Sequence, residues 1–190
     1  MKRYKNAGFT IIELIITISI MAILTTVVVI SLRTSQERAN DKERADDVDA
    51  IARTLENIYN NGIQSSSDAS LKQPMGYPGT VWVSNMISNP SHPQVVAILE
   101  ELELSSLKTP GSSSTSLPYN LTSASSNGDP PSVSANTYVY QPLKADNSIC
   151  SWGNGAIHPI QPRAESPCVK FNIYYMKSDG TIVKKESINR

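Results

Sequence analysis

From Leu14 to Leu32 the chain has no charged residue, no proline and no glycine. Nothing in this stretch breaks a helix, and apart from five serine and threonine residues its side chains are apolar. At a rise of about 1.5 Å per residue, such a helix crosses the roughly 30 Å hydrocarbon core of a bilayer. A buried core helix is the alternative, but a chain of 190 residues has no core large enough to surround it.

Signals for catalysis and for nucleic-acid binding are also missing. The 17 basic and 17 acidic residues balance, so net charge gives no reason to expect a nucleic acid partner. The sequence contains no G-x-S-x-G element, no glycine-rich phosphate loop and no paired histidines, because His92 and His158 are isolated. We therefore expect no enzyme activity, no cofactor and no metal site. Four nearby aspartates fan around a predicted helix and favour a solvated face: Asp41, Asp46, Asp47 and Asp49.

The chain has only two cysteines, Cys150 and Cys168, and both lie far from the apolar block. A disulfide between them requires an oxidising compartment, which would place the C-terminal part outside the cytoplasm. Basic residues flank the apolar block on both sides, so they do not fix its orientation by themselves. Free thiols, or a metal site with His158 between the cysteines, are the alternatives.

Glu13 is the only charged residue in the apolar block that begins at Phe9. A carboxylate deep in a membrane span costs about 2.5–3.5 kcal/mol on insertion scales. No lysine or arginine lies between residues 6 and 32 to pair with it, although near the edge of the span it could snorkel to the interface. A cleaved secretory signal is a poor alternative, because the block is too long and no small-residue cleavage site follows it.

The segment KNAGFTIIELIITISIMAIL, residues 5–24, resembles the prepilin signal of type IV pilins and type II secretion pseudopilins. The resemblance implies that a prepilin peptidase cuts between Gly8 and Phe9 and that the new amino group of Phe9 is N-methylated. It also implies that Glu13, the fifth mature residue, pairs with the N-terminal amine of an adjacent subunit during assembly. Glu13 lies four residues after Phe9, on the same face of a helix.

Two positions depart from the common pilin pattern. Ile30 stands near the place where many type IV pilins have a helix-breaking proline, and Ala22 replaces a glycine that is common in the family. Nothing in the sequence therefore forces this helix to unwind in a filament.

Residues 33–61 also lack glycine and proline, and apolar residues recur in them at three- and four-residue steps. This amphipathic pattern predicts that the helix continues to Asn61 and ends at Gly62. A short coiled coil is the alternative. The predicted buried stripe comprises Val48, Ile51, Ala52, Leu55, Ile58 and Tyr59.

The remaining residues predict a small α+β head. We expect irregular structure over 63–93, a short helix from Gln94 to Leu104 with Pro93 at its first position, and a Ser- and Pro-rich loop over 105–136. Strands are predicted at 137–143, 169–176 and 181–186, and an Asp-Gly turn joins the last two. This resembles the pilin head, a long N-terminal α-helix packed on a small C-terminal antiparallel β-sheet. The loop closed by Cys150 and Cys168 resembles the C-terminal region of many pilins.

The resemblance implies a structural subunit with four segments: residues 1–8 a basic leader that is removed, 9–32 a transmembrane and filament-core helix, 33–61 its amphipathic continuation, and 62–190 the globular head. Its expected partners are prepilin peptidase, copies of itself and other pilins, an inner-membrane assembly platform and, before assembly, the lipid bilayer. We expect a single-pass precursor in the cytoplasmic membrane with its head outside, and then a cell-surface or periplasmic pilus filament. The alternatives are a pseudopilin of a type II secretion or DNA-uptake system, and a membrane-anchored binding domain that does not polymerise.

Overall fold

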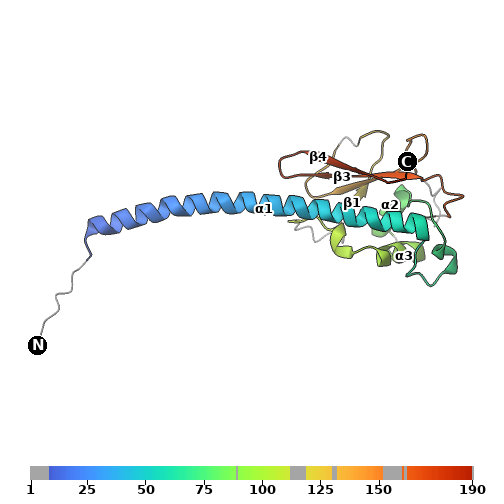
Figure 1. Cartoon of the computed structure of the whole chain (residues 1–190), viewed down its shortest axis with the longest axis horizontal. Coiled ribbons are helices and arrows are strands. Elements are labelled where there is room, and N and C mark those ends of the chain that lie inside the picture. Colours follow the sequence, from blue (N-terminus) through green and yellow to red (C-terminus); the bar gives the residue numbers. More distant parts are fainter. Residues whose placement is uncertain are drawn as a thin grey trace, which may run out of the picture. The chain divides into compact units, whose positions relative to one another are not determined.

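The computed structural model describes residues 9–88, 90–111, 119–129, 132–151, 160 and 162–189. The chain divides after Ala39 into two compact units, which we call the N-terminal unit (residues 1–39) and the C-terminal unit (residues 40–190). Helix α1 spans Ile11–Asn61 and contributes to both units. Among the described residues, all other helices and strands belong to the C-terminal unit (Figure 1).

Helix α1 ends at Asn61, as the sequence predicts, because Gly62 follows it. Gly62 has a φ angle of +78°, a left-handed conformation that glycine adopts without strain. Its N–H group donates to the carbonyl of Ile58 at 2.9 Å, which completes the last turn. A Cβ atom at Gly62 would collide with the backbone oxygens of Leu71 and Gln73.

The predicted buried stripe on the second half of α1 is confirmed. Five of its members are at most 4% exposed, and Tyr59 is half-buried. They form one cluster with side chains from the sheet and the short helices. Two charged residues on α1, Arg44 and Glu56, are also buried, and the apolar pattern did not predict them.

A four-stranded sheet in the order β1-β2-β3-β4 lies beside this part of α1. The strands are β1 Leu121–Ser123, β2 Tyr138–Leu143, β3 Lys170–Met176 and β4 Ile182–Glu186. Strands β2, β3 and β4 are antiparallel, as predicted, and Gly180 in the β3–β4 turn has a φ angle of +85°.

The sheet differs from the predicted antiparallel sheet at one edge, where the additional strand β1 pairs with β2 in parallel. Strand β1 lies in the segment that was predicted to be loop, and its three residues are too few to show a strand pattern. Tertiary contacts hold it in place: the N–H of Tyr138 donates to the carbonyl of Asn120 at 2.9 Å, and the Leu121 side chain is 1% exposed.

The region after α1 is less irregular than predicted. It contains the 3₁₀ helix η1 (Ala69–Lys72) and the α-helix α2 (Thr80–Ser88). Helix α2 escaped prediction because it is short and rich in β-branched residues, which have low helix propensity. Packing against the core compensates, since Trp82, Val83 and Met86 are at most 3% exposed.

Helix α3 spans Pro93–Glu101, close to the predicted helix but three residues shorter at its end. Leu102 leaves the helix in an extended conformation, and its side chain is 5% exposed. His92 caps the start of α3, because its Nδ1 accepts a hydrogen bond from the N–H of Gln94 at 3.3 Å. A second 3₁₀ helix, η2 (Leu104–Leu107), follows.

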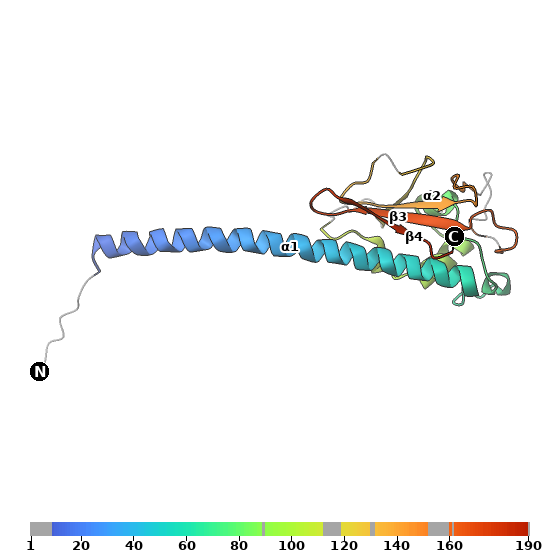
Figure 2. The same ribbon diagram turned by 45° about the horizontal axis from the view of Figure 1, so that its top comes forward.

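Polar contacts join the second half of α1 to the β3–β4 hairpin and the residues after it, and we call this line of contacts the polar seam. Asp41 accepts hydrogen bonds from the N–H and Oγ of Ser178, both at 2.8 Å. Asp49 forms an ion pair with Lys185 at 2.8 Å. The residue that comes later in α1 contacts the residue that comes later in the hairpin. The β3–β4 hairpin therefore runs alongside the helix, as Figures 1 and 2 show.

Candidate functional site

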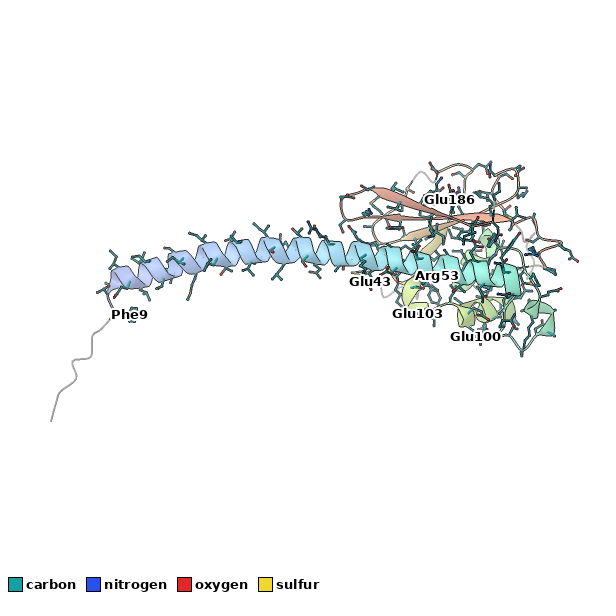
Figure 3. All side chains as sticks on the ribbon, viewed as in Figure 1. Phe9, Glu43, Arg53, Glu100, Glu103 and Glu186 are labelled. Carbon is teal, nitrogen blue, oxygen red and sulfur yellow. A yellow bond between two sulfur atoms is a disulfide. The ribbon has the colours of Figure 1, made fainter. Side chains whose placement is uncertain are left out.

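The described residues of the N-terminal unit form an apolar surface, and none of them is buried. Every residue from Phe9 to Ala39 is exposed, and the large aliphatic side chains of this region are 43–79% exposed. Figure 3 shows these side chains projecting on all sides of the first half of α1. By length and composition, α1 is the one helix among the described residues that is able to cross a membrane. An apolar surface of this extent requires lipid or other protein around it.

Polar side chains within the apolar block hydrogen-bond to the helix itself. The hydroxyl groups of Thr17, Ser19, Thr25 and Thr26 donate to carbonyl oxygens three or four residues earlier, at 2.7–2.9 Å. Such bonds satisfy each hydroxyl donor without water. This part of α1 is therefore suited to the hydrocarbon core of a membrane, which offers no hydrogen-bonding partners.

Glu13 belongs to a capping box at the start of α1. The N–H and the hydroxyl of Thr10 both donate to Oε2 of Glu13 at 2.8 Å. In return, Oγ1 of Thr10 accepts from the N–H of Glu13 at 3.3 Å. These reciprocal bonds satisfy backbone donors that would otherwise have no partner at the helix N-terminus.

The capping role of Thr10 was missed in the sequence, although the T-x-x-E signal is present in it. The hydrogen bonds that described residues donate to Glu13 all end on Oε2, so Oε1 has no partner among those residues. Glu13 thus has one oxygen committed to its own helix and one oxygen available to a second donor.

The predicted processing site lies at the edge of the described residues. Phe9 precedes the helix, where Figure 3 labels it. Its side chain is 83% exposed. Gly8, with the rest of the predicted leader, lies outside the described residues. Cleavage at this bond and methylation of Phe9 stay predictions.

A family model of the prokaryotic N-terminal methylation motif matches residues 3–29. This match includes Gly8, Phe9, the capping box and most of the apolar block. The chain carries a prepilin signal. The resemblance found in the sequence is thereby confirmed for this segment, and the signal is that of type IV pilin and pseudopilin precursors. Searches among curated proteins and among solved structures return no match to the chain.

The prepilin signal and the fold both indicate a pilin-like protein. The long helix with a small mixed sheet at the C-terminus is an α+β, pilin-like layout. The signal marks structural subunits of the pilin type rather than enzymes, and it implies a prepilin peptidase and pilin–pilin assembly in general terms. Together with the apolar helix, it is suited to a membrane-anchored precursor.

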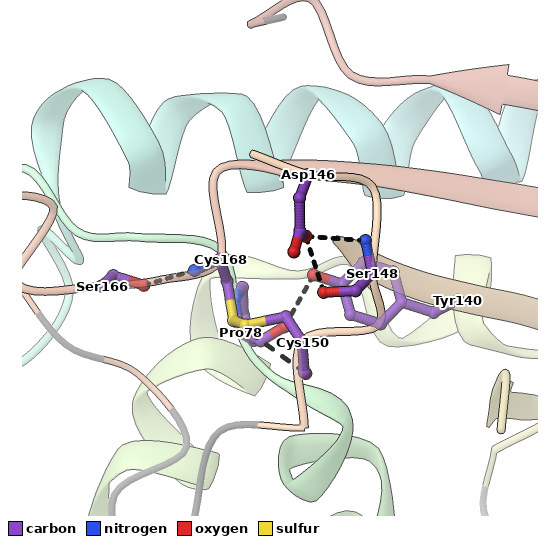
Figure 4. The surroundings of a disulfide bond; sticks show 7 residues. All are labelled: Pro78, Tyr140, Asp146, Ser148, Cys150, Ser166 and Cys168. Carbon is purple, nitrogen blue, oxygen red and sulfur yellow. Dashed lines mark hydrogen bonds between the residues drawn. A yellow bond between two sulfur atoms is a disulfide. The ribbon is translucent and has the colours of Figure 1, made fainter. Parts of the chain in front are cut away.

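The predicted disulfide between Cys150 and Cys168 is confirmed, so the alternative of free thiols is wrong. Figure 4 shows this bond and its surroundings. Both cysteines are at most 1% exposed. The alternative metal site is also wrong, because a disulfide leaves no thiolates to bind a metal. His158, which that alternative required, lies outside the described residues.

The disulfide anchors the segment between η1 and α2 to the sheet. The carbonyl of Cys168 accepts from the N–H of Tyr77 at 3.0 Å, and the carbonyl of Cys150 accepts from the N–H of Thr80 at 3.2 Å. Figure 4 shows the nearby hydrogen bond of 2.8 Å from the Tyr140 hydroxyl to the carbonyl of Pro78. The cross-link therefore lies in the core of the C-terminal unit.

The four aspartates predicted to lie on a solvated face have different environments. Asp46 is exposed, whereas Asp41 and Asp49 belong to the polar seam. Asp47 is half-buried and accepts a hydrogen bond of 2.7 Å from the hydroxyl of Tyr138. The prediction of a solvated face therefore holds for Asp46, whereas the sheet and its β3–β4 turn contact the other three aspartates.

Proposed function

We propose that this chain is the precursor of a structural subunit of a type IV pilus-like filament. Prepilin peptidase cuts between Gly8 and Phe9, and the new amino group of Phe9 is N-methylated. The helix then leaves the bilayer and packs against the same helix of other subunits. An open filament follows from a heterologous contact that repeats without closing.

The observation that carries this proposal is the combination of the prepilin signal with a fully exposed apolar helix whose first turn holds Glu13. A membrane anchor alone needs an apolar helix but has no use for a carboxylate within it. Cleavage would create an amino group at Phe9, the one cation within the apolar block, with a reference pKa of about 7.7–8.0. Oε1 of Glu13 supplies an acceptor for that amine from a neighbouring subunit.

The proposal assigns a use to each part of the chain. Residues 1–8 are the leader, 9–32 the membrane and filament-core helix, 33–61 its amphipathic continuation, and 62–190 the globular head. The precursor resides in the cytoplasmic membrane with its head outside, where an inner-membrane assembly platform meets it. The disulfide supports the outside location of the head, since disulfides persist in oxidising compartments.

Processing is tested by expressing the full chain with and without a prepilin peptidase and measuring its intact mass. We expect the mass of residues 9–190 plus one methyl group when the peptidase is present, and the uncut mass when it is absent. The variant Gly8→Ala should accumulate uncut in both cases, whereas Ala7→Ser, one residue earlier, should be processed. An uncut wild-type chain in the presence of an active peptidase would favour the non-polymerising anchored domain.

A pseudopilin of a type II secretion or DNA-uptake system is the second candidate. Ile30 and Ala22 favour it slightly, because the stem helix is continuous where many type IV pilins carry helix breakers. Shearing cells and probing the released material for the methylated chain separates the two candidates. A surface pilin appears in the sheared fraction, whereas a pseudopilus subunit stays with the cells.

A further inference from the structure

A hollow lies on the face of the sheet that is turned away from α1. Side chains alternate along a strand, so Gln141 of β2, Asn172 of β3 and Glu186 of β4 all point to this face. Together with neighbouring loops, they line a cavity of about 360 Å³ within the C-terminal unit. Pockets that hold small organic ligands measure about 300–1,000 Å³.

The apolar half of the same sheet face is already covered. Val139 and Tyr174 pack there with Ala124 and Val133, which belong to the segment after β1. The polar half lies beside this cluster and opens as the hollow. The covering segment thus forms one wall of the hollow, through Gly128 and Asp129.

Gln141 fixes the floor of the hollow. Its side chain is 1% exposed, and its Nε2 donates to the carbonyls of Ser126 and Gly128 in the wall. Its Oε1 accepts from Asn172 at 2.8 Å and from the hydroxyl of Tyr174 at 3.0 Å. A buried amide with all its hydrogen-bonding groups satisfied holds its partners in fixed positions, which is the preorganisation that a binding site requires.

The charges around the hollow balance. Lys184 forms an ion pair with Glu186 at 2.9 Å and lies 4.0 Å from Asp129. Lys170 donates to Oδ1 of Asn147 at 3.1 Å. Because each ammonium already faces an acceptor of its own chain, the hollow has no excess positive charge that would select phosphate or another anion.

Three residues that line the hollow each have a polar atom with unused hydrogen-bonding capacity. Among the described residues, nothing bonds to Nδ2 of Asn147, to Oδ1 of Asn172 or to Oδ2 of Asp129. One donor and two acceptors around one hollow match a ligand that both donates and accepts at neighbouring atoms. Among the described residues of the lining, Leu143 is the one aliphatic side chain on this face of the sheet, which is too little apolar surface for a lipid chain.

We propose that this hollow binds a neutral saccharide unit. Each sugar hydroxyl donates one hydrogen bond and accepts others, and vicinal hydroxyls present these groups side by side. Asn147 would donate to one hydroxyl, while Asn172 and Asp129 would accept from others. This inference goes beyond filament assembly and adds a ligand-binding role to the head.

The test uses the full chain in micelles of a detergent without a sugar headgroup, because glycoside detergents would compete. Saturation-transfer NMR is recorded with galactose, glucose, N-acetylglucosamine, N-acetylgalactosamine and lactose. We expect transfer to at least one of them, with no displacement by inorganic phosphate. Retention on beads that carry immobilised lactose, whose terminal unit is galactose, distinguishes the end of a glycan from a free sugar as the source of the ligand.

Two variants locate the binding. Asn172→Leu replaces both polar groups by methyl groups and keeps the branched shape and the number of heavy atoms. Asp129→Ala changes a largely exposed residue and so leaves the fold intact. Each should weaken binding by about fivefold or more, while Asn57→Leu, on the exposed side of α1, should leave it unchanged. The proposal is overturned if no saccharide shows transfer, if both variants retain full binding, or if phosphate displaces the sugar. None of these measurements depends on processing or assembly.

Discussion

The hydroxyl of Tyr77 donates a hydrogen bond of 2.8 Å to the carboxylate of Glu56 in the interior of the C-terminal unit. The N–H of Ile188 and the amide of Asn189 also donate to this carboxylate, both at 2.7 Å. Glu56 therefore bonds α1 both to the segment before α2 and to the C-terminal residues. It is the last contact of the polar seam.

Replacing Glu56 with alanine should destabilise the C-terminal unit by about 3 kcal/mol. A buried carboxylate is tolerated only where donors replace its water, and its removal leaves those donors without a partner. Urea unfolding of the full chain in micelles, followed by tryptophan fluorescence, measures the change, because Trp82 is fully buried. Asn57→Ala, at the adjacent exposed position of α1, should change the midpoint little. Equal midpoints for the two variants would contradict this account.

Asp47 has a raised pKa because it is partly buried among other carboxylates. Burial is the largest cause, Glu43, Asp46 and Glu103 add to it, and the hydrogen bond from Tyr138 opposes it, which leaves the pKa at about 6. Glu43 lies on α1 and Glu103 lies just after α3, as labelled in Figure 3. The folded state therefore binds a proton at Asp47 more tightly than the unfolded state does.

The stabilisation that protonated Asp47 provides is present at pH values below about 4 and is lost as the pH rises through about 6. Asp47→Asn keeps an acceptor for Tyr138 without the charge, so it should be more stable than the parent at pH 7.5. We expect a gain of about 1 kcal/mol after solvent screening, or about 3 °C in the unfolding midpoint. Thermal scans should show this gain shrinking towards pH 4, whereas Glu100→Gln, at an exposed carboxylate on α3, should show no such trend. A gain that is independent of pH would contradict the assignment.

Much of this architecture is readable from the sequence because single strong patterns specify it. The uncharged run, the three- and four-residue stripe and Gly62 predict one helix ending at Asn61, and the Asp-Gly turn predicts the last hairpin. These features are local, so neighbouring residues contain all the information needed.

The features that were missed depend on contacts between distant segments. Helix α2 and strand β1 are short, and core packing rather than propensity holds them. In the sequence, Glu56 looks like a solvated helix residue, because its partner Ile188 lies 132 residues later in the chain. The Thr10–Glu13 capping box is different, because its signal is local and was present in the sequence.

Removing the disulfide by the double substitution Cys150→Ser and Cys168→Ser should cost about 3 kcal/mol of unfolding free energy, because the bond closes a loop across a separation of 18 residues. Urea midpoints of the oxidised parent and the double variant provide the measurement. Reductant in the absence of denaturant should leave the parent oxidised, since both cysteines are buried. The double variant should be insensitive to reductant. Rapid reduction of the folded parent would show that the C-terminal unit opens locally around the bond.

Glu13 combines two properties that substitutions can separate: it caps α1 through Thr10, and it carries a negative charge. Glutamine also serves at this position of a capping box, so Glu13→Gln removes the charge and keeps the cap. Thr10→Ala removes a hydroxyl partner of the cap and keeps the charge.

We expect Glu13→Gln to be processed and inserted normally but to yield at least about tenfold less assembled filament. A buried charge that requires one specific partner is a device for register, and the amide provides no charge to pair with an amine. Thr10→Ala should assemble at close to the parental level, because lipid or neighbouring helices support the rest of α1. Quantifying the methylated chain in sheared filaments and in membranes measures both effects. Normal assembly of Glu13→Gln, with loss of assembly in Thr10→Ala, would show that Glu13 acts through the helix cap and not through its charge.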